Sequence, residues 1–465
     1  MSGRVLVVTY YFPPLGGVGV QRTLKYITYL PRWGWQPAVV TPRNPAYTVR
    51  DPSLLDLLPA DLEVHRTGSF EPGRLPIAVG RRLHRRSAGT SDGAADLAGK
   101  PSSGWHRKLG WVLGGLWNRT WNVLLFPDAQ IGWVRFGARA GSKVFQHQAF
   151  DVVYSTSAPV SAHLIADRIK RSTGRPWVAD FRDPWIGNPF VAPLRGPKGW
   201  MQRRMERSIV SRADRVVLAM DGLRDMFVNR YPEMADKFVY IPNGYDRNDL
   251  AGLTPVKGEP GRFTVLFAGS LYRPGELEAL LGGVERLVER RPDLRRRLRV
   301  QFVGRASAGN RHLADVYTAP GRMGDVVSFE GFVPRVQALA RMAGADALLQ
   351  LMTDDPGTSM FVGGKLIEYM AFDRPILAVM PPGEGRRLVD GLPGGRTADV
   401  EPGSVASALE DLLDHPPAQG PTDPTGRYDR VNLAGELAAL LDQVAAEWKT
   451  KKGYASGAAQ PAPSR

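Results

Sequence analysis

Two charged side chains, Lys365 and Glu368, follow the glycine pair Gly363-Gly364 on one short stretch of chain. The pattern predicts a glycine turn, then a short helix, then a buried strand within residues 373–379. The turn suits a diphosphate, because glycines leave backbone N–H groups open and a helix N-terminus attracts anions. Lys365 adds a cation, and the carboxylate of Glu368, which accepts hydrogen bonds, suits a pair of ribose hydroxyls. The segment predicts a nucleotide site; the alternative is a surface helix with one internal ion pair.

A second glycine loop, Gly16-Gly17, lies between an apolar strand predicted over residues 4–10 and a helix predicted over residues 21–30. With the next strand at 37–41, this order is a βαβ opening, and its loop stands where open parallel sheets bind ligands. The alternative is that the glycines let the helix pack closely on its sheet. The sequence Tyr-Phe-Pro-Pro before these glycines makes the loop longer than the dinucleotide fingerprint, which disfavours nicotinamide binding.

The overall composition favours a two-domain α/β enzyme from a reducing compartment. The chain has 465 residues, 43% of them hydrophobic, with 51 glycines and 38 prolines, which is too long for one ordinary core. Disulfides, thiolate zinc sites and cysteine nucleophiles are excluded because the chain has no cysteine. Met1 leads directly into a core strand without a signal peptide, and no uninterrupted apolar run reaches about eighteen residues. We therefore expect a cytoplasmic protein that does not span a membrane.

Positive charge is in excess, with 61 Lys and Arg against 46 Asp and Glu and a net charge of +15. No nucleic-acid partner is expected, because no helix-turn-helix, zinc-finger or aromatic RNA-binding pattern accompanies the charge. Basic residues cluster at 81–86, and a stretch predicted to be disordered follows at 87–104. Residues 105–124 combine tryptophans and basic side chains with leucines at near-helical spacing. Such a segment suits an anionic membrane surface, contacted through about 81–121, at the inner face of the cytoplasmic membrane. The alternative is a core-packing helix.

Strand-like and helical segments alternate along the rest of the chain, as in parallel βαβ units. Predicted strands lie at 151–155, 177–180, 215–219 and 237–241 in the first half, and at 264–268, 298–303, 327–329 and 347–351 in the second. We expect an N-terminal domain over 1–250 with a basic insert at about 81–127, a second domain over 251–427, a helix over 428–448 and a disordered tail over 449–465.

Several short motifs occur in a fixed order. They are Gly16-Gly17, ADFRDPW at 179–185, PNG at 242–244, FAGS at 267–270, FVGR at 302–305, GF at 331–332 and KLIEYMA at 365–371. Taken together, the set resembles the glycosyltransferases of family four and covers most of residues 4–448, apart from the basic insert. The resemblance implies the GT-B fold: an acceptor-side and a nucleotide-sugar-binding Rossmann-like domain facing a central cleft, with the C-terminal helix returning to the N-terminal domain.

The resemblance also implies a reaction, namely sugar transfer from a nucleotide-diphosphate donor with retention at the anomeric carbon. No metal or other cofactor is implied, because fixed cations and a helix N-terminus can stabilise the departing diphosphate. The acceptor is expected to be lipid-linked, a glycan or a small molecule. The implied donor-binding residues are Gly16, Gly17, Gly269, Arg305, Gly331, Phe332, Gly363, Gly364, Lys365 and Glu368. The implied catalytic residues are Arg182, Asp183, Arg273 and Lys365, with an internal ion pair as the alternative for Arg182 and Asp183.

The chain departs from the family pattern at several positions. Met360 stands where family four usually has a glutamate, and Ser270 where it usually has an arginine. Arg273 and Arg305 are the candidates to replace that positive charge, with a solvated loop position as the alternative for each. The family's acceptor-side histidine is absent, and His163 is expected to pack rather than to catalyse. Two other functions therefore stay open: a nucleotide-sugar epimerase of the same fold, and a membrane-docked nucleotide-sugar-binding protein whose catalysis has decayed.

Overall fold

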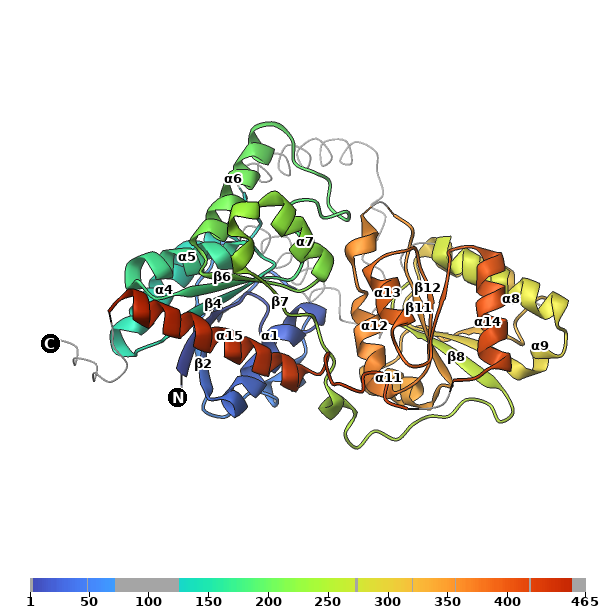
Figure 1. Cartoon of the computed structure of the whole chain (residues 1–465). Helices are drawn as coiled ribbons and strands as arrows, with labels where there is room; N and C mark the ends of the chain where they lie inside the picture. Colours follow the sequence, from blue (N-terminus) through green and yellow to red (C-terminus); the bar gives the residue numbers. More distant parts are fainter. Residues whose placement is uncertain are drawn as a thin grey trace, which may run out of the picture. The chain divides into compact units, whose positions relative to one another are not determined.

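The computed structural model describes residues 3–47, 49–71, 125–271, 275–319, 321–355, 357–417 and 420–453 (Figure 1). The predictions for residues 81–86, 87–104 and 105–124, for Arg273 and for the tail beyond residue 453 lie outside these ranges. The chain divides into two compact units. The first unit comprises Met1–Trp185, Leu194–Val217 and Ala438–Arg465, and the second comprises Ile186–Pro193 and Leu218–Leu437. The expected domain boundary at residue 250 stays a prediction.

The first half of the chain forms a seven-stranded sheet in the order β3-β2-β1-β4-β5-β6-β7. β1 pairs in parallel with β2 on one side and with β4 on the other. β4 and β5 are buried along their whole length, as expected for strands covered on both faces. The bounds are β1 (Gly3–Val8), β2 (Trp35–Pro42), β3 (Glu63–Thr67), β4 (Val152–Ser157), β5 (Trp177–Phe181), β6 (Arg215–Leu218) and β7 (Phe238–Tyr240).

Helices connect these strands, and glycine allows two of them to approach closely. A Cβ on Gly137 or Gly141 of α4 would overlap the side chains of Ile165 and Ile169 on α5, respectively. The bounds are α1 (Val18–Tyr29), α4 (Val134–His147), α5 (Ser161–Thr173), α6 (Gly196–Arg212) and α7 (Asp221–Arg230), with short 3-10 turns η1 (Leu30–Trp33), η2 (Pro52–Leu55), η3 (Ile131–Trp133), η4 (Pro232–Lys237) and η5 (Arg247–Leu250). Among the described helices, none is both long and apolar enough to cross a membrane.

The C-terminal helix α15 (Arg430–Lys451) contributes its second half to the first unit. Glu447 pairs with Arg215 at 2.5 Å, and the indole N–H of Trp448 donates to the carbonyl of Gly174 at 2.7 Å. The expected return of this helix to the N-terminal part of the chain is thus confirmed. The helix continues to Lys451, so predicted disorder from residue 449 is wrong for its last turn, where lysines favour the negative end of the helix dipole.

The second half of the chain forms a six-stranded sheet in the order β10-β9-β8-β11-β12-β13, in which every neighbouring pair is parallel. Its strands are β8 (Phe263–Ala268), β9 (Leu298–Val303), β10 (Val327–Phe329), β11 (Ala347–Leu351), β12 (Ile376–Val379) and β13 (Gly395–Ala398). The connecting helices are α8 (Gly275–Arg290), α9 (Leu294–Arg297), α10 (Ala308–Tyr317), α11 (Arg335–Gly344), α12 (Gly364–Tyr369), α13 (Glu384–Asp390) and α14 (Pro402–Asp414), with 3-10 turns η6 (Thr358–Met360) and η7 (Met370–Phe372).

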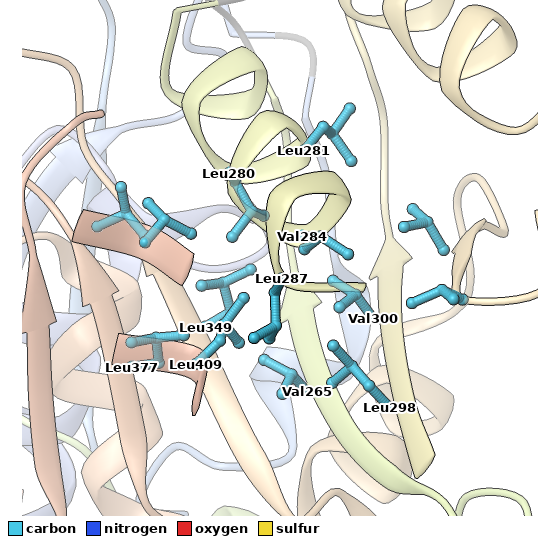
Figure 2. Close-up of a cluster of buried hydrophobic side chains, with 14 of the residues drawn as sticks. Val265, Leu280, Leu281, Val284, Leu287, Leu298, Val300, Leu349, Leu377 and Leu409 are labelled. Atoms are coloured by element: carbon cyan, nitrogen blue, oxygen red, sulfur yellow. The ribbon is translucent and has the colours of Figure 1, made fainter. Parts of the chain in front are cut away.

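A hydrophobic cluster holds α8 against this second sheet (Figure 2). Leu280, Val284 and Leu287 recur at helical spacing on α8 and are fully buried together with Val265 of β8 and Val300 of β9. Each such side chain contributes roughly 1.5–3 kcal/mol of burial free energy. The cluster makes the sheet a rigid support for the loops at its carboxyl edge.

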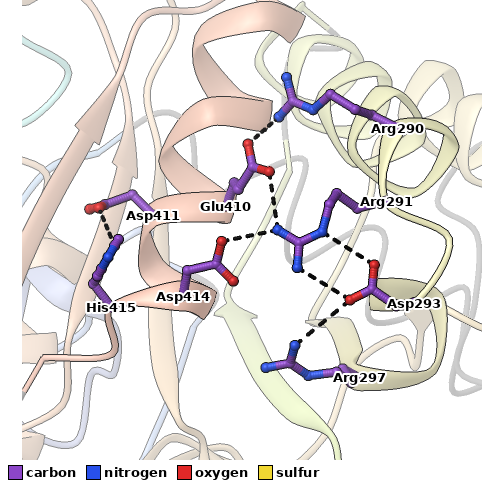
Figure 3. A network of polar contacts seen from close by, with 8 residues as sticks. All are labelled: Arg290, Arg291, Asp293, Arg297, Glu410, Asp411, Asp414 and His415. Carbon is purple, nitrogen blue, oxygen red and sulfur yellow. Dashed lines mark hydrogen bonds and ion pairs between the residues drawn. The ribbon is translucent and has the colours of Figure 1, made fainter.

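Several arginines form ion pairs on the surface of the second unit (Figure 3). Arg291, the residue after α8, pairs with Asp414 at 3.0 Å and with Asp293 at 3.2 Å, and Arg290 pairs with Glu410. Exposed pairs of this kind each contribute about 0–1 kcal/mol. These arginines therefore link α8 to α14 and are not free for a ligand.

Both sheets reverse their strand order at one point, between β1 and β4 in the first and between β8 and β11 in the second. In open parallel sheets, ligands bind outside the carboxyl ends of the strands at such a point. The candidate site residues therefore need to be located relative to the ends of these four strands.

Candidate functional site

Three neighbouring strands of the second sheet, β8, β9 and β10, are each followed by a glycine with positive φ. The angle is +144° at Gly269, +136° at Gly304 and +70° at Gly331, a region that residues with a Cβ rarely adopt. A Cβ on Gly304 would overlap the carbonyl oxygen of Gly269, and the Gly304 N–H donates to the carbonyl of Gly331 at 2.6 Å. The glycines thus bring three strand ends into close backbone contact.

Lys365, on α12, reaches the end of β8. Its Nζ lies 4.1 Å from the centre of the Phe267 ring and 3.5 Å from the carbonyl oxygen of Ser270. Its side chain fills the place that a Cβ on Gly269 would take. Burial lowers the pKa of Lys365 from 10.5 to about 8, although two nearby carboxylates, one of them Glu276, favour its charged form. A cation this poorly solvated is stabilised by an anionic ligand.

Glu368 lies one turn after Lys365 on α12 and is paired with a different element. Its Oε1 is 2.8 Å from a terminal nitrogen of Arg335, the first residue of α11. Arg335 is more than half exposed, at 56%, so this pair contributes little stability and a ligand can replace it at low cost. The ribose role of Glu368 stays a prediction.

The buried residue Gln350 of β11 lies directly beside the turn at Gly363. A Cβ on Gly363 would stand 3.1 Å from the Gln350 amide nitrogen, which donates to the carbonyl of Leu351 at 2.8 Å. The Gln350 amide oxygen is buried and accepts no hydrogen bond from the described part of the chain. Sequence reasoning missed this residue, although a single polar residue inside an apolar strand was the available signal.

Arg305 and Phe332 follow β9 and β10 and contact each other. The Arg305 guanidinium carbon lies 5.1 Å from the centre of the Phe332 ring, and Phe332 is 69% exposed. An exposed aromatic face beside a cation can stack on a nucleotide base. The structure thus brings together the predicted groups at Gly269, Arg305, Gly331, Phe332, Gly363, Gly364, Lys365 and Glu368 along one sheet edge, whereas Arg273 lies outside the described ranges.

The glycine loop of the first unit stands at the start of α1. Gly17, with φ +90°, is the N-cap residue of α1, and the Gly16 N–H donates to the carbonyl of Val49 at 3.1 Å. A Cβ on Gly17 would lie 3.3 Å from the Tyr47 hydroxyl oxygen. The loop is therefore held on one side by the segment around residue 49.

Arg182, after β5, is engaged with backbone carbonyls near this loop. Its Nε donates to Ser157 at 2.7 Å, and its terminal nitrogens donate to Ala158 at 3.0 Å and to Gly19. Asp183 is exposed, and partial desolvation of its carboxyl raises its pKa even though the Arg182 charge acts to lower it. The observed geometry gives Arg182 a bracing contact to the first turn of α1, and its predicted catalytic role stays untested.

A buried ion pair that sequence reasoning missed lies beneath the same loop. Arg22 of α1 and Asp180 of β5 are joined by two contacts of 3.0 and 3.1 Å, and the hydroxyls of Tyr154 and Thr156 donate to Asp180 at 2.7 and 2.8 Å. Burial acts to raise the pKa of Asp180, but the Arg22 charge and these donors outweigh it and hold the pKa below its usual range. An aspartate inside an apolar strand was the available signal.

His163 is a core residue, as expected. Its side chain is fully buried, its Nδ1 lies 2.8 Å from the Ser155 hydroxyl, and burial lowers its pKa from 6.5 to about 3. The ring is therefore neutral at physiological pH. Across the described ranges, no group of three or more metal-binding side chains is arranged to hold a metal ion.

Comparison with known families agrees with this architecture. Residues 16–244 match the model of a glycosyl transferase 4-like domain, and residues 262–415 match the model of glycosyl transferases group 1. The chain belongs to the family-four glycosyltransferases with the GT-B fold.

One similar curated protein is the D-inositol 3-phosphate glycosyltransferase of Nocardiopsis dassonvillei, which is 29% identical over 270 residues, or 55% of this chain and 59% of that protein. The matched region thus spans less than two thirds of the length of such curated relatives.

Two solved structures share the fold over nearly the whole chain. Sucrose-phosphate synthase from Thermosynechococcus elongatus is 14% identical with a TM-score of 0.53, covering 97% of this chain and 100% of that one. A putative UDP-N-acetylglucosamine 2-epimerase from Listeria monocytogenes is 11% identical with a TM-score of 0.52, covering 96% and 98%. At such low identity these likenesses concern the fold alone, and the expected pair of Rossmann-like domains is confirmed.

Proposed function

We propose that this protein transfers a sugar from a nucleotide-diphosphate donor to an acceptor. The observation that carries the proposal is Lys365, a half-buried cation held beside the Ser270 carbonyl and the Phe267 ring where glycine-ended strands meet. A partly desolvated cation beside glycine turns, whose backbone N–H groups can donate hydrogen bonds, matches the charge and shape of a diphosphate. Family membership supports the same class of reaction.

The proposed donor position follows the sheet edge from α12 to β10. The diphosphate lies beside Lys365 and the turn Gly363-Gly364, and the ribose hydroxyls donate to Glu368. The base stacks on Phe332, with Arg305 behind it. The buried Gln350 oxygen, which accepts no hydrogen bond from the described part of the chain, is proposed to accept one from a sugar hydroxyl or a water.

The proposed reaction proceeds with retention and without a metal or other cofactor. The bond from the anomeric carbon to the diphosphate oxygen breaks with its electron pair going to that oxygen, and the Lys365 ammonium stabilises the charge that develops there. The acceptor hydroxyl attacks from the same face and gives its proton to the departing phosphate. The chain therefore does not need a side-chain general base.

The acceptor is proposed to bind at the first unit, near Gly16, Gly17, Arg182 and Asp183. It is lipid-linked, a glycan or a small molecule; the curated relatives carry D-inositol 3-phosphate in their names, which makes a small phosphorylated polyol one such acceptor. The protein is proposed to work in the cytoplasm, with residues 81–121 contacting an anionic membrane at its inner face. Deleting those residues should weaken vesicle binding if they anchor the protein.

A thermal-shift panel tests donor binding. UDP-, GDP-, ADP- and dTDP-sugars are added with and without magnesium to the wild type, to Glu368→Ala and to Glu278→Ala, an exposed control on α8. A ligand that binds the folded state raises Tm by mass action. We expect one nucleotide class to stabilise the wild type and the control without magnesium, and not Glu368→Ala. A shift that is equal in all three proteins would refute the assignment of Glu368.

The same donor separates the two other candidate functions. An epimerase would convert the donor's sugar without releasing a nucleoside diphosphate, and its fold likeness to the Listeria monocytogenes protein is the observation in its favour. A nucleotide-sugar-binding protein whose catalysis has decayed would bind the donor and leave it unchanged. The departures from the family pattern at Met360 and Ser270 favour this alternative. Chromatography of the donor after incubation with acceptor mixtures distinguishes transfer, epimerisation and simple binding.

A further inference from the structure

The outward side of α6 carries a tryptophan among arginines. The buried residues of this helix lie on one side of it, and they are Gly199, Gln202, Glu206, Ile209 and Val210. The opposite side faces solvent, with Trp200 56% and Met201 44% exposed. At 100° per residue, this side also holds the exposed side chains Arg203, Arg204 and Arg207.

Charge on α6 is segregated in the same way. Its one acidic residue, Glu206, is buried, whereas the arginines at three, four and seven residues beyond Trp200 are exposed. The first turn has no acidic side chain, and exposed Arg195 stands at the N-cap, where the positive end of the helix dipole disfavours a cation. An anionic partner would complement this arrangement of charge.

We propose that this outward face of α6, formed by Trp200, Met201, Arg203, Arg204 and Arg207, docks on an anionic lipid surface. The Arg204 guanidinium lies 5.5 Å from the centre of the Trp200 ring, so cation and indole meet the surface together. Indole and thioether groups partition into the headgroup region, while guanidinium groups bind lipid phosphates in bidentate fashion. A second copy of the chain is disfavoured, because two such faces carry the same charge.

This inference goes beyond sugar transfer, since lipid binding requires neither donor nor acceptor. Each basic residue at an anionic membrane contributes about 1 kcal/mol, which corresponds to roughly a fivefold change in partitioning. Removing three arginines should therefore weaken binding on the order of a hundredfold.

The test is sedimentation of the full-length protein with large unilamellar vesicles. The vesicles contain phosphatidylglycerol and phosphatidylcholine in equal parts, or phosphatidylcholine alone. The variants are Arg203→Gln/Arg204→Gln/Arg207→Gln and Trp200→Ser. Two matched controls make the same changes at other exposed sites: Arg168→Gln/Arg296→Gln/Arg311→Gln removes equal charge, and Trp33→Ser removes another indole. Unchanged Tm values show that each variant is folded.

The expected result is binding to the phosphatidylglycerol vesicles that falls about a hundredfold in the α6 arginine variant and severalfold in Trp200→Ser, while both controls bind as the wild type does. Equal losses in the α6 variant and the charge control would overturn the proposal, because net charge alone would then explain them. Binding that the α6 variants leave intact would also overturn it, as would a change in oligomeric state without a change in vesicle binding.

Discussion

Replacing Lys365 by methionine should stabilise the protein while it removes donor binding. The side chain keeps its length and its contact with Phe267 but loses a charge that is only partly solvated. The lowered pKa of Lys365, about 8 instead of 10.5, corresponds to a cost of about 3 kcal/mol for the charged form at neutral pH. Loss of the cation–π contact reduces this stabilisation by about 1 kcal/mol. The net gain at about pH 7 is therefore about 2 kcal/mol.

The stabilisation by the methionine variant should decrease as the pH rises. Because the pKa of Lys365 is lowered on folding, the unfolded chain binds more protons than the folded one between about pH 8 and 10.5, and wild-type stability rises with pH across that window. Below about pH 8, both states are protonated and the full cost is present. At about pH 9.5 the remaining cost is roughly 1.4 kcal/mol, so the advantage of the methionine variant should shrink to a few tenths.

Urea unfolding at about pH 7 and pH 9.5 measures this difference. Lys257→Met, which changes an exposed lysine of the same unit, is the matched control and should show no such pH-dependent gain. Hydrogen exchange at the amides of β8 and β11 would locate the gain in the second sheet. A stability difference that is the same at both pH values, or a loss of stability at pH 7, would refute the account of Lys365 as a desolvated cation.

Three further predictions concern Lys365, Gly304 and Asp180. Donor affinity should be highest below about pH 8 and fall up to tenfold per pH unit above it as Lys365 loses its proton, and calorimetric titration showing a flat profile to pH 9.5 would speak against a phosphate contact. Gly304→Ala should lower the free energy of unfolding by several kcal/mol and reduce donor binding, because the φ of Gly304 is +136° and a Cβ there would overlap the Gly269 carbonyl. Gly309→Ala is the control, because a Cβ at this position of α10 meets no other atom. Asp180→Asn should cost about 3–5 kcal/mol in urea unfolding by removing the carboxylate that pairs with the buried Arg22 guanidinium, and a loss below about 1 kcal/mol would contradict the role of this pair.

Strands of the second sheet could be predicted closely from the sequence. The predicted bounds 298–303, 327–329 and 347–351 agree with β9, β10 and β11, because continuous apolar runs between glycine, proline or charged residues define buried parallel strands. β13 has no counterpart among the predicted segments, since its four residues show no apolar pattern and pairing with β12 fixes its position. α14 also has none: its N-cap is Glu401, which accepts from the Ser404 N–H, instead of one of the usual capping residues.

The residue types of the candidate site could be predicted from the sequence, but the contacts between those residues could be predicted less well. The glycine turn and the short helix around Lys365 follow from local pattern, and α12 extends from Gly364 to Tyr369. The packing of Lys365 on Phe267 and Gly269 joins segments that are far apart in the chain, so only the fold could place them together. The pair of Arg22 and Asp180 is a similar case: an aspartate inside an apolar strand is a local signal, but only the fold places Arg22 of α1 beside it.

The path of the chain through its two units restricts the order in which they can be completed during synthesis. The first unit takes its last part from residues beyond Leu437, including the contacts of Glu447 with Arg215 and of Trp448 with Gly174. The ribosome delivers these residues after the whole second unit. The first unit therefore emerges early but cannot be completed until α15 has been synthesised. Until then, chaperones can bind the surface that α15 later covers. The second unit can form its core as soon as it has emerged. A released chain that ends at Leu437 should accordingly hold a folded second unit and an unfinished first one.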